Sequence, residues 1–284
     1  MKSLVAVLVL TSGCIARAAD KPLAILHPVF ARSEDGAPEA SDEEFVPGET
    51  IQFSCQAEGY RKMDKPNDYG KQDVSLKFQI EVRDKNGVLL KPIQEGKIET
   101  TVTQEDKDWK PKLRETIVVP PLADTGEYAV LVKLSDELAK TTEEKRAVFH
   151  IKGREVAASD ALVVRNFRFL RGEDDQKALP VAAYRPGDSV WARFEMTGYK
   201  LGEKNQVDIE YGLTVLREDG SVAYTEPLAA NQKIQTYYPQ RYQPGVLNLN
   251  LAKDQPLEKY TIVLSVRDNL GKQMVETREI FSVE

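Results

Sequence analysis

Two stretches of this chain align with each other without a gap: residues 23–60 (LAILHPVFARSEDGAPEASDEEFVPGETIQFSCQAEGY) and residues 162–199 (LVVRNFRFLRGEDDQKALPVAAYRPGDSVWARFEMTGY). The offset is 139 residues, and Phe30, Arg32, Glu34, Asp35, Pro47, Gly48, Gly59 and Tyr60 fall on Phe169, Arg171, Glu173, Asp174, Pro186, Gly187, Gly198 and Tyr199. A repeat of this length indicates two tandem domains, each with its own core, rather than a solenoid of short units.

Both copies alternate apolar and polar residues with a period of two, which is the pattern of half-buried β-strands. Strands are expected over residues 51–57, 74–82, 128–134 and 147–151, and in the second copy over residues 190–196, 207–215, 260–266 and 279–283. Asn86-Gly87 and Asp219-Gly220 each follow the second strand of a copy, as a tight hairpin turn requires. With about seven strands per copy and no amphipathic helix, the sequence predicts an all-β chain of two Greek-key β-sandwiches. Two small β-barrels are the alternative.

Three motifs resemble parts of immunoglobulin-type domains. Residues 48–55 (GETIQFSC) resemble the second strand of such a domain, and residues 124–128 (DTGEY) resemble the segment that carries its tyrosine corner. Residues 184–190 (YRPGDSV) are similar to a strand start in macroglobulin-type and other bacterial immunoglobulin-like domains. The resemblance implies that Tyr128, and Tyr260 by repeat position, turn their hydroxyls back to the main chain. The family's second cysteine would fall at Val130, so no disulfide is expected.

The start of the chain has the features of a secretion signal. Lys2 precedes a short apolar run (LVAVLVL, residues 4–10), and Ala16-Arg17-Ala18 forms a small-x-small cleavage site. Cleavage after Ala18 leaves domain 1 at residues 19–153 and domain 2 at residues 158–284. The alternative is a lipoprotein signal ending at Cys14, which would anchor the chain to a membrane by a lipid. No later segment is apolar for long enough to span a bilayer, so we expect an exported protein, periplasmic or secreted.

Charge and cysteine content exclude some classes of protein. The net charge is −6 and no basic cluster appears along the sequence, so nucleic acid is not an expected partner. Cys55 is the one cysteine left after signal cleavage. By strand parity its side chain points inward, where a thiol behaves as a small apolar group.

No pattern indicates catalysis or metal binding. The two histidines, His27 and His150, have no second His, Cys or repeated carboxylate spacing around them that would build a zinc site. The sequence predicts no catalytic residues, no metal and no cofactor, and a protein that is not an enzyme. A triad assembled in space from distant residues remains the exception to this expectation.

Residues 237–244 (YYPQRYQP) form the strongest candidate for a binding site. Tyr237 and Tyr238 offer large contact area at little cost in rotamer entropy, and Arg241 can fix a polar or anionic group. Trp191 joins them as a tryptophan that strand parity places on an outer sheet face. The alternative is that the tyrosines pack inside the fold or between the domains.

These features predict a non-catalytic binding module of the cell envelope or extracellular space, whose partner is a protein or a polysaccharide. The alternative function is a structural spacer or assembly subunit that associates with itself or with other envelope proteins. An enzyme or inhibitor is the third hypothesis.

Overall fold

The computed structural model describes residues 21–66, 68–106 and 108–284. The predicted signal peptide, its cleavage site and the Cys14 anchor lie outside these residues. The described chain is all-β, as predicted, and its helical content is two short 3-10 turns, η1 (Gln104–Asp106) and η2 (Glu203–Asn205). Among these residues, no helix has the length and apolarity needed to cross a bilayer.

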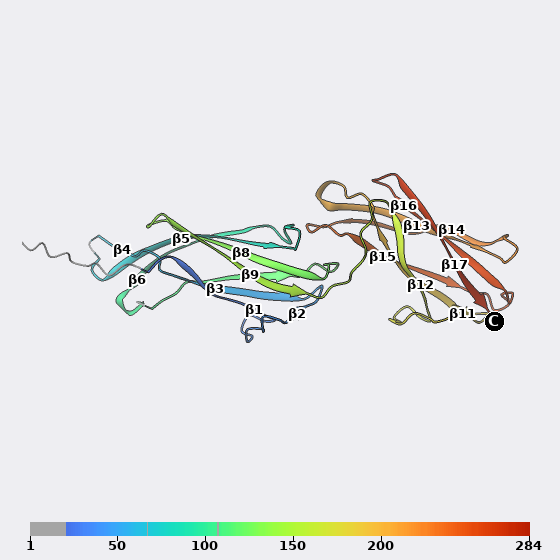
Figure 1. Cartoon of the computed structure of the whole chain (residues 1–284), viewed down its shortest axis with the longest axis horizontal. Helices are drawn as coiled ribbons and strands as arrows, with labels where there is room; N and C mark the ends of the chain where they lie inside the picture. The colour runs from blue at the N-terminus through green and yellow to red at the C-terminus, as the bar shows by residue number, and fades with distance from the viewer. Residues whose placement is uncertain (1–20, 67, 107) are drawn as a thin grey trace, which may run out of the picture.

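Residues 21–153, the N-terminal unit, form two facing sheets (Figure 1). The smaller sheet has the order β1-β3-β7, and the larger has the order β2-β9-β8-β5-β4, with β6 also paired to β5. The strands are β1 (Ala24–Ala31), β2 (Glu44–Phe45), β3 (Thr50–Glu58), β4 (Met63–Asp64), β5 (Lys71–Arg83), β6 (Gln94–Thr103), β7 (Lys112–Val118), β8 (Gly126–Asp136) and β9 (Thr141–Ile151).

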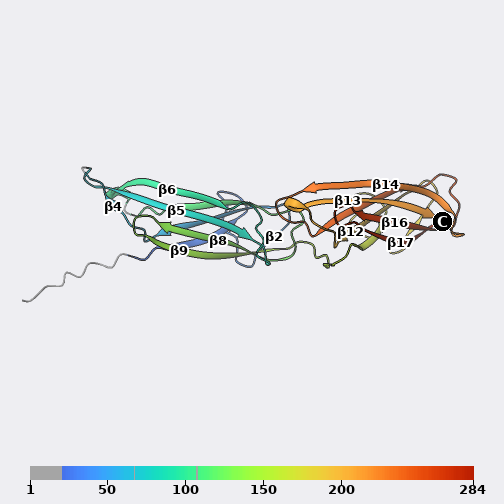
Figure 2. The same ribbon diagram turned by 90° about the horizontal axis from the view of Figure 1, so that it is seen from above.

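Residues 158–284, the C-terminal unit, repeat this plan with the sheets β10-β12-β15 and β11-β17-β16-β13-β14. The strands are β10 (Val163–Leu170), β11 (Ala183–Tyr184), β12 (Ser189–Thr197), β13 (Gln206–Leu216), β14 (Val222–Gln235), β15 (Tyr242–Asn250), β16 (Lys259–Asp268) and β17 (Gln273–Val283). The two units lie end to end, and the chain is elongated in both views (Figures 1 and 2).

Each unit has a hydrophobic core between its two sheets. The first core gathers Phe45, Phe53, Tyr128 and Phe149, and the second gathers Phe169, Tyr184, Phe194, Tyr260 and Phe281. Cys55 is 1 % exposed, as strand parity predicts, and burial raises its pKa to about 11. It is a free thiol packed in the hydrophobic core of the N-terminal unit.

The tyrosine corners implied by the immunoglobulin resemblance are present in both units. The Tyr128 hydroxyl donates to the Asp124 carbonyl at 3.0 Å, and the Tyr260 hydroxyl donates to the Pro256 carbonyl at 3.1 Å. Each hydroxyl thus returns to the main chain four residues upstream, and the predicted equivalence of the two tyrosines is confirmed.

Every strand that the alternation predicts lies inside an observed strand, but no range was predicted for β1, β6, β7, β10, β14 and β15. Two of these strands, β6 and β14, have an irregular pattern of residues. Both are edge strands, because each pairs on one side with β5 or β13 and its other side is open. Their exposed positions carry charged and polar residues that break the alternation, as is common where a strand has one free edge.

The first strand of each unit contains a β-bulge at the same place in the repeat. The pairing of β1 with β3 shifts between Leu26 and Val29, and the pairing of β10 with β12 shifts between Arg165 and Arg168. His27 and Asn166, 139 residues apart, have φ angles of 51° and 50°. The residue with positive φ accommodates the extra length of the strand. As a result, Leu26 and Val29 lie on the same face of the sheet, and so do Arg165 and Arg168.

Glycine is required directly after β3 and β12, where each strand end meets the start of its own unit. Gly59 has φ +74°, and a Cβ atom there would lie 2.0 Å from the Pro22 carbonyl oxygen. Gly198 repeats the contact with the Ala161 carbonyl oxygen, also at 2.0 Å.

We expect Gly59→Ala to lower the free energy of unfolding by about 3 kcal/mol, since it combines a positive φ with a collision against backbone. Gly87→Ala is the matched control, because Gly87 has φ +80° and no atom within 4 Å of the added Cβ. It should cost about 1 kcal/mol. Urea unfolding of both variants measures the difference. Equal losses would show that the close approach to Pro22 carries no penalty of its own.

Candidate functional site

Residues 237–241 lie at the junction between the two units. Tyr238 belongs to the C-terminal unit, but its ring is 5 % exposed and packs into the core of the N-terminal unit. Its hydroxyl donates to Asp84 Oδ2 at 2.9 Å. The C-terminal unit thus inserts the Tyr238 side chain into the core of the N-terminal unit.

The two carboxylate oxygens of Asp84 have different hydrogen-bond partners. Oδ1 accepts the main-chain N–H groups of Asn86 and Val88, both at 2.8 Å, and so holds its own hairpin turn. Oδ2 accepts Tyr238 and lies 3.3 Å from the Arg241 guanidinium. The Asp84 side chain is 2 % exposed, and it is compensated by a cation and by hydrogen bonds, as a buried carboxylate requires. We call Asp84, Tyr238 and Arg241 the clasp.

A second contact ties the connecting segment to the C-terminal unit. Arg154 follows the last strand of the N-terminal unit and forms an ion pair with Glu195 Oε1 on β12. Arg168 on β10 lies 3.5 Å from the same oxygen. The Glu195 side chain is 2 % exposed, so the connector is anchored at a buried charge.

A groove of about 700 Å³ opens beside the clasp and is lined by both units. The N-terminal unit contributes Arg83 at the end of β5, and Val88 and Leu89 from the connection between β5 and β6. The C-terminal unit contributes Lys204, Asn205, Gln235, Thr236 and Tyr237. Ligand sites occur preferentially in such clefts between domains.

The C-terminal wall of this groove has a strained turn. Lys204 and Asn205 have φ angles of 52° and 56°, and consecutive non-glycine residues rarely adopt this conformation. The Asn205 amide donates to the Tyr237 carbonyl at 2.6 Å, which fixes the turn to the tyrosine segment. The Tyr237 side chain is 51 % exposed at the groove.

The structure separates the four residues that the sequence grouped as one site. Tyr237 faces the groove, whereas Tyr238 and Arg241 are engaged by Asp84 inside the molecule, which is the alternative of contact between domains. Trp191 is not at the junction. It lies on β12 six positions before Thr197, the residue that pairs with Tyr242 at the junction end of the strand. Ligand binding by these four residues stays a prediction, and the geometry leaves Tyr237 exposed and Trp191 half-buried at separate places.

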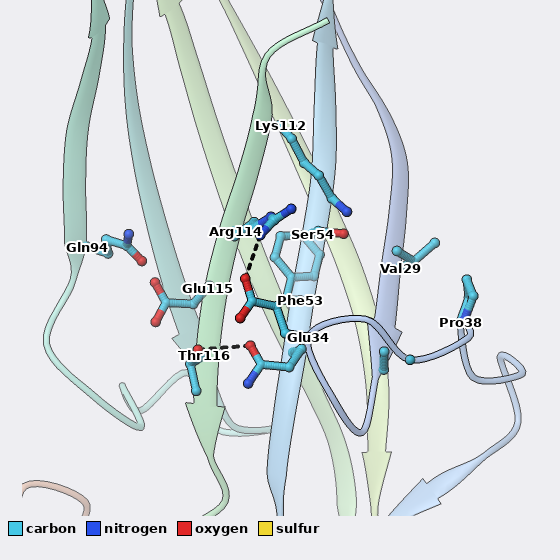
Figure 3. Close-up of a pocket in the computed structure, with 13 residues that line it drawn as sticks. Val29, Glu34, Pro38, Phe53, Ser54, Gln94, Lys112, Arg114, Glu115 and Thr116 are labelled. Carbon is cyan, nitrogen blue, oxygen red and sulfur yellow. Dashed lines mark hydrogen bonds and ion pairs between the residues drawn. The ribbon is translucent and has the colours of Figure 1, made fainter.

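A second hollow, of about 580 Å³, lies on the smaller sheet of the N-terminal unit (Figure 3). Arg114 donates to Glu34 at 2.6 Å, and the Thr116 hydroxyl donates to the Gln52 amide oxygen at 2.9 Å. These polar groups satisfy one another across the hollow. Glu115 on β7 also lines the hollow and forms an ion pair with Lys91.

Burial changes the acidity of the tyrosines at the junction. Desolvation raises the pKa of Tyr238, and the nearby Tyr128 and the Asp84 carboxylate raise it further. Desolvation also raises the pKa of Tyr128, whose ring borders the same cluster. Both hydroxyls are therefore neutral donors at physiological pH. The described residues hold no group of three or more His, Cys, Asp or Glu side chains placed to bind a metal ion.

Comparison with known proteins gives no family for the chain. No family model and no curated protein matches it. Among solved structures, the C-terminal domain of the Streptococcus agalactiae AgI/II polypeptide BspA aligns with 12 % identity and a TM-score of 0.31, over 92 % of this chain and 100 % of that one. A family 123 glycoside hydrolase from Clostridium perfringens aligns with 13 % identity and a TM-score of 0.29 over 44 % of this chain, which spans 27 % of the hydrolase.

Red sea bream transglutaminase aligns with 12 % identity and a TM-score of 0.24, over 94 % of this chain and 32 % of that one. Similarities this low show nothing of the activity or the ligand of this chain.

We expect Tyr238→Phe to flatten the fall in stability that the parent shows above about pH 10, the usual pKa of an unfolded tyrosine. The folded-state pKa is raised, so the folded protein holds the proton longer than the unfolded chain does. This contribution is complete below pH 10 and is lost as pH rises from there. Below pH 10 the variant should lose about 1 kcal/mol, because the bond to Asp84 is missing.

Urea unfolding across alkaline pH measures both effects, with Tyr69→Phe as control, since the Tyr69 side chain is fully exposed. Parallel pH curves for the parent and Tyr238→Phe would mean that the junction tyrosine does not titrate with unfolding.

Proposed function

We propose that this protein is an exported, non-catalytic binding module of two immunoglobulin-like Greek-key β-sandwiches in tandem, and that it holds its ligand in the groove between them. The observation that carries the proposal is that the groove is lined by both units while a buried clasp joins them. Because the two walls are held by the clasp rather than by a free linker, little ordering remains to be done on binding.

The strand pairing supports the immunoglobulin-like part of the proposal. In each unit a two-residue strand runs parallel to the last strand, with β2 beside β9 and β11 beside β17. The first, third and seventh strands of the N-terminal unit make the smaller sheet, and the remaining strands make the larger one. Together with the tyrosine corner in both units, this is the arrangement expected of immunoglobulin-type sandwiches. Export is supported by the signal-like residues 1–18.

The chemistry of the groove favours a ligand with a flat apolar face and polar edges. Tyr237, Val88 and Leu89 supply apolar contact area. Lys204 supplies hydrogen-bond donors, while the Asn205 amide is bonded to the Tyr237 carbonyl and the Arg83 guanidinium is paired with Glu81 at 2.6 Å. A sugar ring of an envelope polysaccharide or an extended protein segment fits this combination.

The test is affinity capture from a native envelope and polysaccharide extract with three proteins: the parent, Tyr237→Ala and Tyr69→Ala. Tyr69 is the matched control, because it is also an exposed tyrosine and lies between β4 and β5, at the end of the molecule away from the junction. We expect the parent and Tyr69→Ala to retain the same species and Tyr237→Ala to lose it. The species should be released chemically unchanged, since the proposal is binding without turnover.

Retention by all three proteins would remove the groove as the binding surface. Release of a shortened or modified ligand would contradict the non-catalytic part of the proposal.

A structural role is the second candidate, and the open edge strands favour it. The two edge strands β6 and β14 lie along the same side of the elongated molecule (Figure 2). β14 is 14 residues long, and Val222, Tyr224 and Leu228 on it are exposed. A free edge of this length can accept a strand from another chain.

If the protein assembles through these edges, its sedimentation coefficient should rise with concentration in the absence of any ligand. Leu228→Lys on β14 should reduce this association, and Ile280→Lys is the control, because Ile280 is also an exposed apolar residue and lies on β17, on the other side of the same sheet. A single species at all concentrations would leave the binding module as the surviving proposal.

A further inference from the structure

The bulge in β10 brings two arginines to the outer face of the smaller sheet of the C-terminal unit. Arg165 and Arg168 are three residues apart and would point to opposite faces of a regular strand. Because the pairing shifts between them, Arg165 lies opposite Glu195 and Arg168 lies opposite Arg193 on β12. The neighbouring residues Val164, Phe167 and Phe194 pack on the core side. We call the outward-facing set Arg165, Arg168, Trp191, Arg193 and Glu195 the arginine face.

The positive charge of the arginine face exceeds the negative charge that meets it. Arg168 and the connector residue Arg154 share one carboxylate oxygen of Glu195. Arg193 bonds to the main-chain carbonyls of Glu173 and Asp175, which leave its charge in place. Arg165 makes no hydrogen bond or ion pair within the part of the chain that the structure describes, and its Nε is buried.

Glu195 Oε2 is also buried without a partner in these residues, directly across the strand pair from Arg165. Buried polar atoms are usually satisfied, so an unpaired donor on Arg165 and an unpaired acceptor on its register partner Glu195 mark an incomplete hydrogen-bond network.

The first copy of the repeat shows that the fold does not need these arginines. The matching positions of the N-terminal unit, at the same offset of 139 residues, are Leu26, Val29, Gln52, Ser54 and Gln56. None is charged, although the bulge, the strand pairing and the core are the same. The charge is therefore an addition to the scaffold, made in one copy.

Trp191 adds an aromatic ring to the same face. It stands four positions along β12 from Glu195, about 13 Å at the rise of a β-strand. Its pairing partners are Leu170 and Asn248. Arginine guanidinium groups bind carboxylates by paired hydrogen bonds, and a tryptophan ring offers a flat apolar surface with an N–H at its edge. A ligand that meets both carries anionic groups and a ring, as an acidic polysaccharide does and a single small anion does not.

We propose that the arginine face binds an acidic polysaccharide, whose carboxylates lie on Arg165 and Arg168 and one of whose sugar rings lies on Trp191. This site is separate from the groove at Tyr237, so either can fail without the other.

The test is calorimetric titration of the whole protein with three probes: an oligogalacturonate, neutral maltohexaose and inorganic polyphosphate. The oligogalacturonate should bind, more weakly at high salt, and maltohexaose should not. Arg165→Gln/Arg168→Gln should weaken binding roughly 10-fold or more, since hydrogen bonds between charged groups are lost. Trp191→Gln, which installs the residue of the first copy, should weaken the binding of oligogalacturonate and leave the binding of polyphosphate unchanged.

The matched control is Lys112→Gln/Arg114→Gln, which removes two cations from the smaller sheet of the N-terminal unit (Figure 3). It should bind the oligogalacturonate as the parent does, and Tyr237→Ala should do the same. Thermal melting confirms that each variant folds.

Three outcomes would overturn the proposal. One is no binding of the oligogalacturonate by the parent. The second is an equal loss in the Lys112/Arg114 control, which would show attraction by overall charge. The third is tighter binding of polyphosphate than of oligogalacturonate, with no effect of Trp191→Gln on either. This result would make the face a general anion site and exclude a specific polysaccharide site.

Discussion

The relation between the two halves of this molecule depends on one buried carboxylate. Asp84 folds its own hairpin through Oδ1 and holds the other unit through Oδ2, so the same side chain serves local and long-range structure. Its burial is tolerable because Arg241 compensates the charge, and the bond from Tyr238 is strong because the site is dry. If that carboxylate were lost, the hairpin turn would lose two hydrogen bonds and the C-terminal unit would lose its bond from Tyr238 at the same time. The groove beside it exists only while both walls are held.

The clasp also explains why two tyrosines that adjoin in sequence have different environments. Tyr237 and Tyr238 lie in a bend that follows β14, where Tyr238 enters the N-terminal core and Tyr237 faces the groove. One residue fixes the joint and its neighbour is left accessible at the edge of the groove. Structural and recognition roles are thus divided between two adjacent residues, and a change at one of them bears on the geometry of the other.

Much of the fold could be predicted from the repeat and the alternation of residues. Strands such as β5 and β13 were predicted because inward and outward residues alternate without a break, and Tyr128 and Tyr260 because their motif is local. The clasp could not be predicted, since Tyr238 and Asp84 are 154 residues apart and the segment around Tyr238 has no period. The arginine face was missed because parity fails at a bulge. The one available signal was the pair His27 and Asn166, of which asparagine is a residue type that tolerates a positive φ.

The shared bulge bears on how a duplicated chain can acquire a second task. It gives each copy two half-buried positions on the outer face of the sheet that belong to no hydrophobic core, so their side chains can change without altering the core or the strand register. Leucine and valine stand there in one copy and two arginines in the other, on backbones of the same shape. The bulge thus lets the surface residues of one copy mutate while the fold stays the same. The two copies can therefore acquire different surface chemistry on one shared backbone.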